Sequence, residues 1–305
     1  ARVTPPLVIV SRRLPEPVER ELAMRFGARL NATDIPLGPD GLVHALREAD
    51  ALVCTVTDRL NAEVLGAGGF RARALVNVGV GFNHIDVAAA KAAGLVVTNT
   101  PDVLTDATAD CAMTLMLAVM RRAGEGEREL RGGRWTGWRP THLMGTQVTG
   151  KTVGIVGFGR IGRAMAERCH GGFRMPVLWF DPAIPAGAQP DGPWTRVATL
   201  DELLGRADVV SLHCPATPAT RHLMNAARLR QMKPSAFLVN TARGDVVDEA
   251  ALVAALDDGT IAGAGLDVFE HEPTVHPRLL ATEKAVLLPH LGSATLETRV
   301  AMGMR

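Results

Sequence analysis

Three side chains with complementary chemistry follow predicted strands in the second half of the chain. Arg243 carries a planar guanidinium that suits bidentate capture of a carboxylate. His290 can give a proton to a carbonyl oxygen, because an imidazole titrates near neutral pH. Glu272 lies in a loop, where it is either a solvated charge or the partner that fixes the tautomer of His290. Together the three residues indicate proton transfer to a substrate that is held by its carboxylate.

A glycine-rich loop at mid-chain predicts a dinucleotide site. Gly157, Gly159 and Gly162 form the pattern G-x-G-x-x-G between an apolar run and a predicted helix, and Arg160 and Ile161 complete the loop. The glycines allow a tight turn, a close approach of the backbone to a pyrophosphate, and close packing of helix on strand. The helix N-terminus that follows attracts the phosphates.

Asp181 ends the next apolar run and bears on the identity of the cofactor. A carboxylate at this position accepts hydrogen bonds from ribose hydroxyls and repels a 2′-phosphate. Pro182 and Ala183 follow it, where an NADP enzyme would be expected to carry an Arg or another phosphate-binding group. We therefore predict that NAD(H) is preferred over NADP(H).

Other candidate residues come directly after predicted strands, at the edge where open α/β sheets bind their ligands. Asp267 can orient a nicotinamide, or it can bond the backbone amides of its own turn. The remaining candidates at this edge are His213, Cys214, Pro215, Thr241 and Ala242 in the second half of the chain, and Val80 and Gly81 in the first.

Strands and helices alternate along the chain, which is typical of parallel βαβ units. The first hundred residues predict strands at 7–10, 51–54, 75–78 and 95–98, with helices at 17–26, 42–47, 62–65 and 87–93. A long helix at 106–122 and an irregular Gly- and Arg-rich stretch at 124–149 come next. A second series predicts strands at 152–156, 177–180, 209–212, 237–240, 263–266 and 285–288, with helices at 163–169, 201–204, 249–256 and 296–304.

This pattern predicts an α/β protein with two doubly wound parallel-sheet domains. We expect a Rossmann-type NAD-binding domain at 101–289 and a smaller, flavodoxin-like substrate domain at 1–100. The last helix is expected to return to the smaller domain, which would then include 290–305 and be discontinuous. The ligand edges of the two sheets are expected to face a cleft between the domains.

Composition excludes several classes of function. The 305 residues carry 33 basic and 32 acidic side chains, so no strong field attracts nucleic acid or a membrane surface. The four cysteines lack disulfide spacing, and no metal-site motif is present, so we expect reduced thiols and no bound metal. The apolar run at 7–10 is too short for a signal peptide, and no stretch approaches the ~20 apolar residues of a membrane span. We expect a cytoplasmic protein.

The motifs together resemble the D-isomer-specific 2-hydroxyacid dehydrogenase family over nearly the whole chain. The resemblance rests on the glycine loop with Asp181, LHCP at 212–215, TPATR at 217–221, NTARG at 240–244, GLDVFEHEP at 265–273, PHLGSAT at 289–295, and VGVGFNHID at 78–86.

The resemblance implies an NAD(P)-dependent enzyme with Arg243, Glu272 and His290 as its catalytic residues. It implies that the amides of Val80 and Gly81 bind the substrate carboxylate together with Arg243. The expected cofactor contacts are Thr108, Gly157, Gly159, Arg160, Ile161, Gly162, Asp181, His213, Cys214, Pro215, Thr220, Thr241, Ala242, Asp267 and Gly292.

Within the family, the segments 135–140 and 292–295 are most similar to the glyoxylate/hydroxypyruvate reductase branch. That branch often prefers NADPH, whereas Asp181 indicates NADH. We base the prediction on Asp181 and expect NADH to be preferred. The family implies a homodimer formed through the nucleotide-binding domain, with 106–131 and the tryptophan-bearing arm after it as the contact. Family members usually continue past the last helix, so the possibility that the C-terminus is trimmed or disordered at Arg305 stays open.

Two other functions stay open from the sequence. One is a dehydrogenase for another D-2-hydroxy acid, either D-lactate-like or 3-phosphoglycerate. The other is an NAD-sensing binding protein similar to the corepressor relatives of the family, which keep the same three residues. Formate dehydrogenases of this fold carry Gln where Glu272 stands, which argues against that branch.

Overall fold

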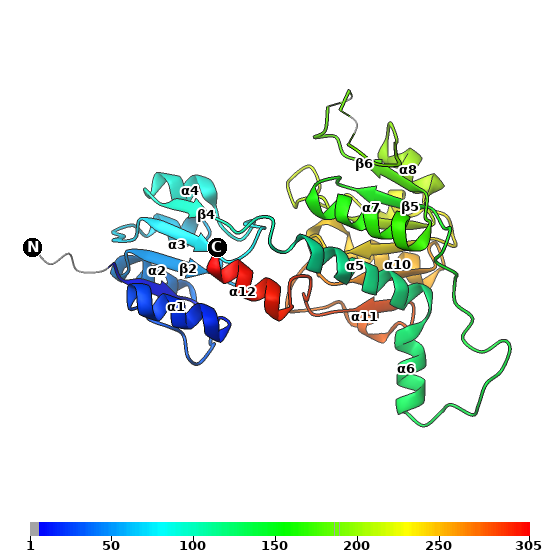
Figure 1. The fold of residues 1–305 in the computed structure, drawn as a ribbon, viewed down its shortest axis with the longest axis horizontal. Helices are drawn as coiled ribbons and strands as arrows, with labels where there is room; N and C mark the ends of the chain where they lie inside the picture. The colour runs from blue at the N-terminus through cyan, green and yellow to red at the C-terminus, as the bar shows by residue number, and fades with distance from the viewer. Residues whose placement is uncertain (1–5, 186, 189) are drawn as a thin grey trace, which may run out of the picture. The chain divides into compact units, whose positions relative to one another are not determined.

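The computed structural model describes residues 6–185, 187–188 and 190–305. Residues 1–5, which belong to the expected substrate domain, and residues 186 and 189 lie outside the described part. The chain divides into two compact units. Unit 1 contains the described residues up to Leu104 together with Ser293–Arg305, and unit 2 is Thr105–Gly292. Figure 1 shows the elements of both units.

Unit 1 is built on a parallel sheet in the order β1-β2-β3-β4. The strands are β1 (Val8–Val10), β2 (Ala51–Cys54), β3 (Ala74–Asn77) and β4 (Val96–Thr98). A single parallel bridge joins Ile9 to Arg29 on the free side of β1. Counting that bridge as a minimal strand, the chain order across the sheet is 2-1-3-4-5, which is the flavodoxin-like order.

Helices cover both faces of this sheet because alternate strand residues point to opposite sides. Leu52 packs with the helices α2 (Pro39–Glu48), α3 (Ala62–Gly66) and α4 (Val87–Ala92). Its neighbour Val53 packs with α1 (Glu16–Phe26) on the other face, where Val300 of α12 (Leu296–Met304) joins the cluster. A Cβ on Gly303 would lie 2.5 Å from the side chain of Val18, so α12 packs closely on α1.

Unit 2 contains a seven-stranded parallel sheet in the order β11-β10-β9-β8-β5-β6-β7. The strands are β5 (Val153–Val156), β6 (Val177–Phe180), β7 (Trp194–Arg196), β8 (Val209–Leu212), β9 (Phe237–Asn240), β10 (Gly263–Leu266) and β11 (Ala285–Leu287). Numbered from β5, this is the Rossmann order 3-2-1-4-5-6 with one further strand at the edge. The predicted class, two doubly wound parallel sheets, is therefore confirmed.

The strand β7 was not predicted from the sequence. This edge strand has three residues, of which Trp194 is buried and Thr195 is exposed. A run of three with one inward side chain carries too little period-2 signal to stand out from the Gly- and Pro-rich loop before it.

The sheet of unit 2 is covered by helices on both faces. Ile155 and Trp179 face α5 (Thr105–Met120) and α7 (Arg160–Phe173), and the ring of Phe158 stacks on Trp179 at 4.6 Å between centroids. The alternate residues face the layer that contains α8 (Leu200–Arg206), α9 (Ala226–Leu229), α10 (Glu249–Asp257) and α11 (Pro277–Ala281). No helix in the described part of the chain is long and apolar enough to span a membrane.

The segment 124–149 differs from its prediction as an irregular stretch. Its beginning is helical, as α6 (Ala123–Arg131), and the irregular arm starts only after Arg131. Pairs such as Arg122–Glu125 and Arg131–Glu127 stabilise the helix surface. No residue of α6 is buried, so the helix lacks the apolar stripe from which a helix is predicted in a sequence. Figure 1 shows α6 and the arm extending away from the sheet of unit 2.

Candidate active site

The glycine loop lies where the strand order of unit 2 reverses, between β5 and β8. Gly157 has a positive φ of 88°, and a Cβ there would lie 2.7 Å from the carbonyl carbon of His213 and 2.6 Å from the amide nitrogen of Cys214. A Cβ on Gly162 would overlap the carbonyl oxygen of Gly157. Both positions therefore require glycine, and the backbone forms the close-packed turn that a pyrophosphate site needs.

The first turn of α7 supplies the donors of this site. Gly159 is the N-cap and places no side chain over the helix end, and Arg160, Ile161 and Gly162 form the first turn. The free N–H groups and the dipole of a 14-residue helix favour an anion at this position.

Asp181 lies at the end of β6 and faces the glycine loop. Its Oδ2 accepts the N–H of Phe158 at 2.8 Å, and its Oδ1 accepts the N–H of Ala183 at 2.9 Å. The carboxylate is thus fixed beside the turn at which a dinucleotide would bind. Together with the glycine cradle, this arrangement fits a bound NAD-type cofactor.

The loop after β8 contains four predicted cofactor contacts. Ser211 Oγ lies 2.8 Å from Nε2 of His213, and desolvation lowers the pKa of His213 to about 4, so its imidazole is neutral at physiological pH. Cys214 is buried against the glycine loop. Thr220 closes the loop through its hydroxyl, which donates to the carbonyl of Pro215 at 2.6 Å.

The loop after β9 presents Arg243. Thr241 is buried, and the N–H of Ala242 donates to Asn240 Oδ1 at 3.0 Å, which shapes the turn. Desolvation lowers the pKa of Arg243, and the negative charges of Glu272 and Asp245 oppose that shift. An arginine stays protonated under any such shift, so the loop holds a half-buried cation near Glu272.

Asp267, at the end of β10, bonds backbone amides of the turn that follows β11 and not those of its own turn. Its Oδ1 accepts the N–H of Leu291 at 2.6 Å, and its Oδ2 accepts the N–H of Gly292 at 2.7 Å. Its carbonyl accepts the N–H of His290 at 2.9 Å. Burial raises the pKa of Asp267 despite these donors. The buried Thr108 of α5 lies beside Gly292 and Asp267, so the three form one group.

Glu272 and His290 form a hydrogen-bonded pair. Glu272 Oε2 lies 2.8 Å from Nδ1 of His290, and Glu272 Oε1 accepts the N–H of Phe269 at 3.0 Å. His290 has a left-handed backbone, with φ 55°, which Asp267 holds through the turn. Because Nδ1 faces the carboxylate, Nε2 is the nitrogen that can exchange a proton with a ligand.

Burial alone would raise the pKa of Glu272, but the hydrogen bond and charge of His290, the N–H of Phe269 and the charge of Arg243 outweigh it. The pKa of Glu272 therefore lies below its ordinary value, and the side chain is a carboxylate at neutral pH. The pair can hold one proton on the imidazole next to a fixed negative charge, which is the requirement for a general acid.

In unit 1, the predicted carboxylate-binding loop is held by two asparagines that the sequence analysis did not identify. The buried Asn77 donates to the carbonyls of Gly79 at 3.1 Å and Gly81 at 3.0 Å. Asn99 donates to the carbonyl of Val80 at 2.9 Å. Because the two asparagine side chains bind three successive carbonyls, the conformation of the loop is fixed before any ligand binds. The sequence signal for Asn77 is its position at the end of a predicted strand, just before a G-x-G turn whose carbonyls its side chain can bind.

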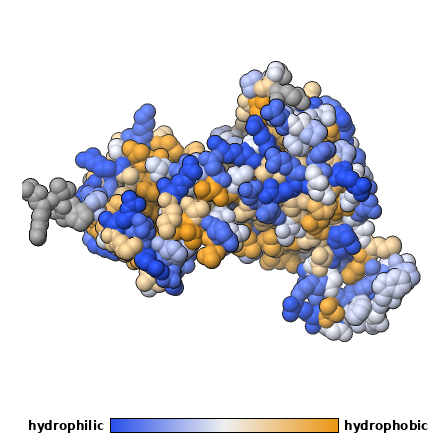
Figure 2. Space-filling view, viewed as in Figure 1, coloured by the Kyte–Doolittle hydropathy of each residue, from blue (hydrophilic) through white to orange (hydrophobic). Residues whose placement is uncertain are grey.

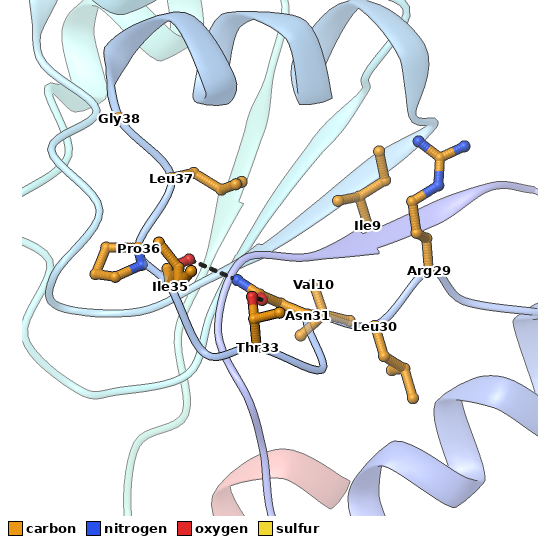
Figure 3. Close-up of a pocket in the computed structure, with 10 residues that line it drawn as sticks. All are labelled: Ile9, Val10, Arg29, Leu30, Asn31, Thr33, Ile35, Pro36, Leu37 and Gly38. Atoms are coloured by element: carbon orange, nitrogen blue, oxygen red, sulfur yellow. Dashed lines mark hydrogen bonds between the residues drawn. The ribbon is translucent and has the colours of Figure 1, made fainter.

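A separate cavity of about 350 Å³ lies in unit 1, beside β1 and the start of α2. Figure 3 shows Asn31 turned inward, where it donates to the carbonyl of Ile35 at 2.8 Å. Thr33 donates to Asn31 Oδ1 at 3.0 Å, and Arg29 pairs with Glu48. These polar groups are already satisfied within the protein. The lining, Ile9, Val10, Arg29, Leu30, Asn31, Thr33, Ile35, Pro36, Leu37 and Gly38, shares no residue with the predicted site.

The sheet order and the glycine loop define a dinucleotide-binding domain of the Rossmann class. Residues 113–292 match the family model for the NAD-binding domain of D-isomer specific 2-hydroxyacid dehydrogenases. The chain belongs to this family, as its motifs predicted.

Similar proteins are known by sequence and by structure. Glyoxylate reductase of Thermococcus onnurineus is 42% identical over 97% of this chain and 89% of its own length. Glyoxylate reductase of Thermofilum pendens is 43% identical over 97% and 88%. The crystal structure of an NADPH-dependent glyoxylate/hydroxypyruvate reductase from Sinorhizobium meliloti, in complex with NADP and malonate, superposes with a TM-score of 0.86 at 35% identity, covering 98% of this chain and 90% of that one.

Replacing Glu272 with Gln is expected to lower stability in a pH-dependent way. A carboxyl whose pKa is lowered by folding stabilises the folded state above its unfolded pKa, and this stabilisation is lost as the pH falls through the folded value. The thermal midpoint of Glu272→Gln should therefore lie below that of the wild type at pH 7, and the two midpoints should converge toward pH 4 and below. Glu167→Gln, on an exposed position of α7, is the control and should match the wild type throughout. A difference that does not change with pH would contradict the ionised pair.

Proposed function

We propose that the chain catalyses the NAD(P)H-dependent reduction of small 2-oxo acids, glyoxylate to glycolate and hydroxypyruvate to D-glycerate. The observation that carries this proposal is the Glu272–His290 pair, 2.8 Å apart, at the same sheet edge as the glycine loop and Arg243. The two glyoxylate reductases at 42% and 43% identity support the substrate class.

Each residue has one proposed role. Arg243 and the amides of Val80 and Gly81 bind the substrate carboxylate, so unit 1 serves as the substrate domain and unit 2 as the nucleotide domain. His290 donates the proton on Nε2 to the carbonyl oxygen, and Glu272 stabilises the imidazolium before transfer. The nicotinamide, when bound, supplies the hydride that adds to the carbonyl carbon. The product is the 2-hydroxy acid, and His290 regains its proton from solvent.

Replacing His290 with Asn is expected to lower kcat for glyoxylate and hydroxypyruvate ~10²–10⁴-fold, because the general acid is lost. NADH binding, measured by its fluorescence, should be retained. His170→Asn, on the exposed end of α7, should keep wild-type turnover.

Near-wild-type turnover by His290→Asn would contradict the mechanism. A panel of 2-oxo acids separates the remaining alternatives. Reduction of pyruvate or of 3-phosphohydroxypyruvate, the oxo forms of D-lactate and 3-phosphoglycerate, in preference to glyoxylate and hydroxypyruvate would indicate another substrate. NADH binding by the wild type without turnover of any acid would indicate an NAD-sensing protein.

We infer that NADH is preferred over NADPH. Asp181 is held by the N–H groups of Phe158 and Ala183, so it cannot readily turn away from a 2′-phosphate. Arg196, which lies over the ring of Trp179, already donates to the carbonyls of Ile184 and Pro185. The structure from Sinorhizobium meliloti is described as NADPH-dependent, so cofactor choice differs within the family if this inference holds.

The ratio of kcat/KM for NADH to that for NADPH is expected to be about tenfold or more, since a like-charge contact costs at least that factor. Asp181→Ser should lower the ratio mainly by improving the use of NADPH. A wild-type preference for NADPH would refute the inference.

We also propose that a second copy of the chain covers α6 and the arm that follows it. Trp138 is 82% exposed, and Leu130, Trp135 and Met144 are also exposed on this segment. Figure 2 shows apolar residues among polar ones on the projecting segment. Several large exposed apolar side chains on one segment are typical of protein interfaces.

Light scattering after size exclusion is expected to give the mass of a dimer for the wild type. The double substitution Leu130→Ser with Trp138→Ser should shift the mass toward a monomer, because both anchors are lost. Met24→Ser, an exposed apolar position on α1, is the control and should stay dimeric. A monomeric wild type would overturn this proposal.

A further inference from the structure

We propose that Glu249 is a positioning residue that sets the Glu272 carboxylate against His290 through the backbone. Glu249 lies at the start of α10. Its carboxylate accepts the N–H groups of Glu270 and His276, and in the described part of the chain it forms no hydrogen bond with Glu272 or His290. The inference rests on the proposed function and adds to it a residue outside the catalytic trio.

One carboxylate closes both ends of the loop that carries Glu272. Oε2 of Glu249 accepts the N–H of Glu270 at 2.7 Å, and Oε1 accepts the N–H of His276 at 3.1 Å. The Glu249 side chain is buried, with 8% of its surface exposed. The segment 270–276 is therefore tied at its two ends to a single rigid group.

A second brace ties the same loop to its neighbours. Oε1 of Glu270 lies 2.6 Å from Nε2 of His222, and Arg221 lies 3.7 Å from the same oxygen. The N–H of His222 donates to the carbonyl of Asp245 at 2.7 Å. Through these contacts, the loops after β8, β9 and β10 hold one another.

Direct backbone contact connects the loop to Arg243. A Cβ on Gly244, the next residue, would overlap the peptide that joins Phe269 to Glu270. The peptide that Glu249 holds is thus packed against the backbone beside Arg243. A shift of that peptide would move Glu272 and Arg243 relative to each other.

The chemistry of the clamp requires a carboxylate. Two N–H donors need two acceptor atoms, and a carboxylate supplies both in one plane, whereas an amide supplies one oxygen and an NH₂ group. The N-terminus of α10, a helix of nine residues, further favours the negative charge of Glu249. Replacing Glu249 with Gln therefore leaves one buried N–H facing another donor, and the loop must shift.

A shift of this loop acts on the proton donor. Glu272 is fixed by the N–H of Phe269 at 3.0 Å and by His290 at 2.8 Å. Lengthening the second contact weakens the support that the carboxylate gives to the imidazolium. Since catalytic geometry is sensitive to displacements of about 1 Å, the effect should fall on the chemical step.

The test compares Glu249→Gln and Glu249→Asp with the wild type, using NADH with glyoxylate. Glu249→Gln should lower kcat about tenfold and change KM for glyoxylate less than about twofold. The alkaline limb of its pH–rate profile should move to lower pH, and the low-field proton resonance of the Nδ1–H of His290 should shift or disappear. Glu249→Asp, which keeps two acceptor oxygens, should recover part of the loss.

Glu202→Gln is the matched control. Glu202 lies in the first turn of α8 and also accepts a backbone N–H, that of Ala198 at 3.2 Å, but its loop carries no catalytic residue. It should leave kcat and the pH profile unchanged. If Glu249→Gln does not fold, Glu270→Gln tests the second brace, with the same direction of change expected.

Three outcomes are distinguishable. A lower melting temperature of Glu249→Gln with unchanged kcat, pH profile and His290 resonance would overturn the inference, since Glu249 would then be only structural. A shift of the resonance and pH profile with the expected fall in kcat would support it. If the wild type reduces no 2-oxo acid, the proposed function fails, and the resonance of His290 still reports whether Glu249 sets its contact with Glu272.

Discussion

The short contact between Glu272 and His290 is the constraint that the loops of unit 2 must satisfy. The two residues come from loops after different strands, β10 and β11, and their side-chain atoms lie 2.8 Å apart. Such loops would ordinarily be mobile, and a hydrogen bond of this kind tolerates little displacement. Both loops must therefore be fixed by contacts other than the pair itself.

Carboxylates that accept two backbone N–H groups provide these contacts. Asp267 holds the turn of His290, Glu249 holds the loop of Glu272, and Asp181 holds the glycine loop in the same way. Each carboxylate lies at the end of a strand or the start of a helix, so its position is inherited from the sheet. The precision of the site thus derives from regular structure, although its functional side chains lie on loops.

Most of the fold could be predicted from the sequence, because buried parallel strands are continuous apolar runs that end in turn residues. The glycine loop, Asp181 and the strand-end positions of Arg243 and His290 could be predicted for the same reason. The edge strand β7 and the helix α6 could not, since neither has enough buried residues to produce a period. Glu249 could not be predicted because its partners are backbone groups, which leave no trace in the residue pattern, whereas the place of Asn77 at a strand end before G-x-G was a signal that could have been used.

The same reasoning explains why these carboxylates are not interchangeable with amides of equal size. An ion pair on a solvated surface can lose one member at little cost, because water replaces it. A buried N–H that loses its acceptor has no such replacement, and the chain must move to satisfy it. In unit 2, the groups that would move are the peptides beside Arg243, Glu272 and His290. The geometry of the Glu272–His290 pair is therefore coupled to acidic residues that need not contact any ligand.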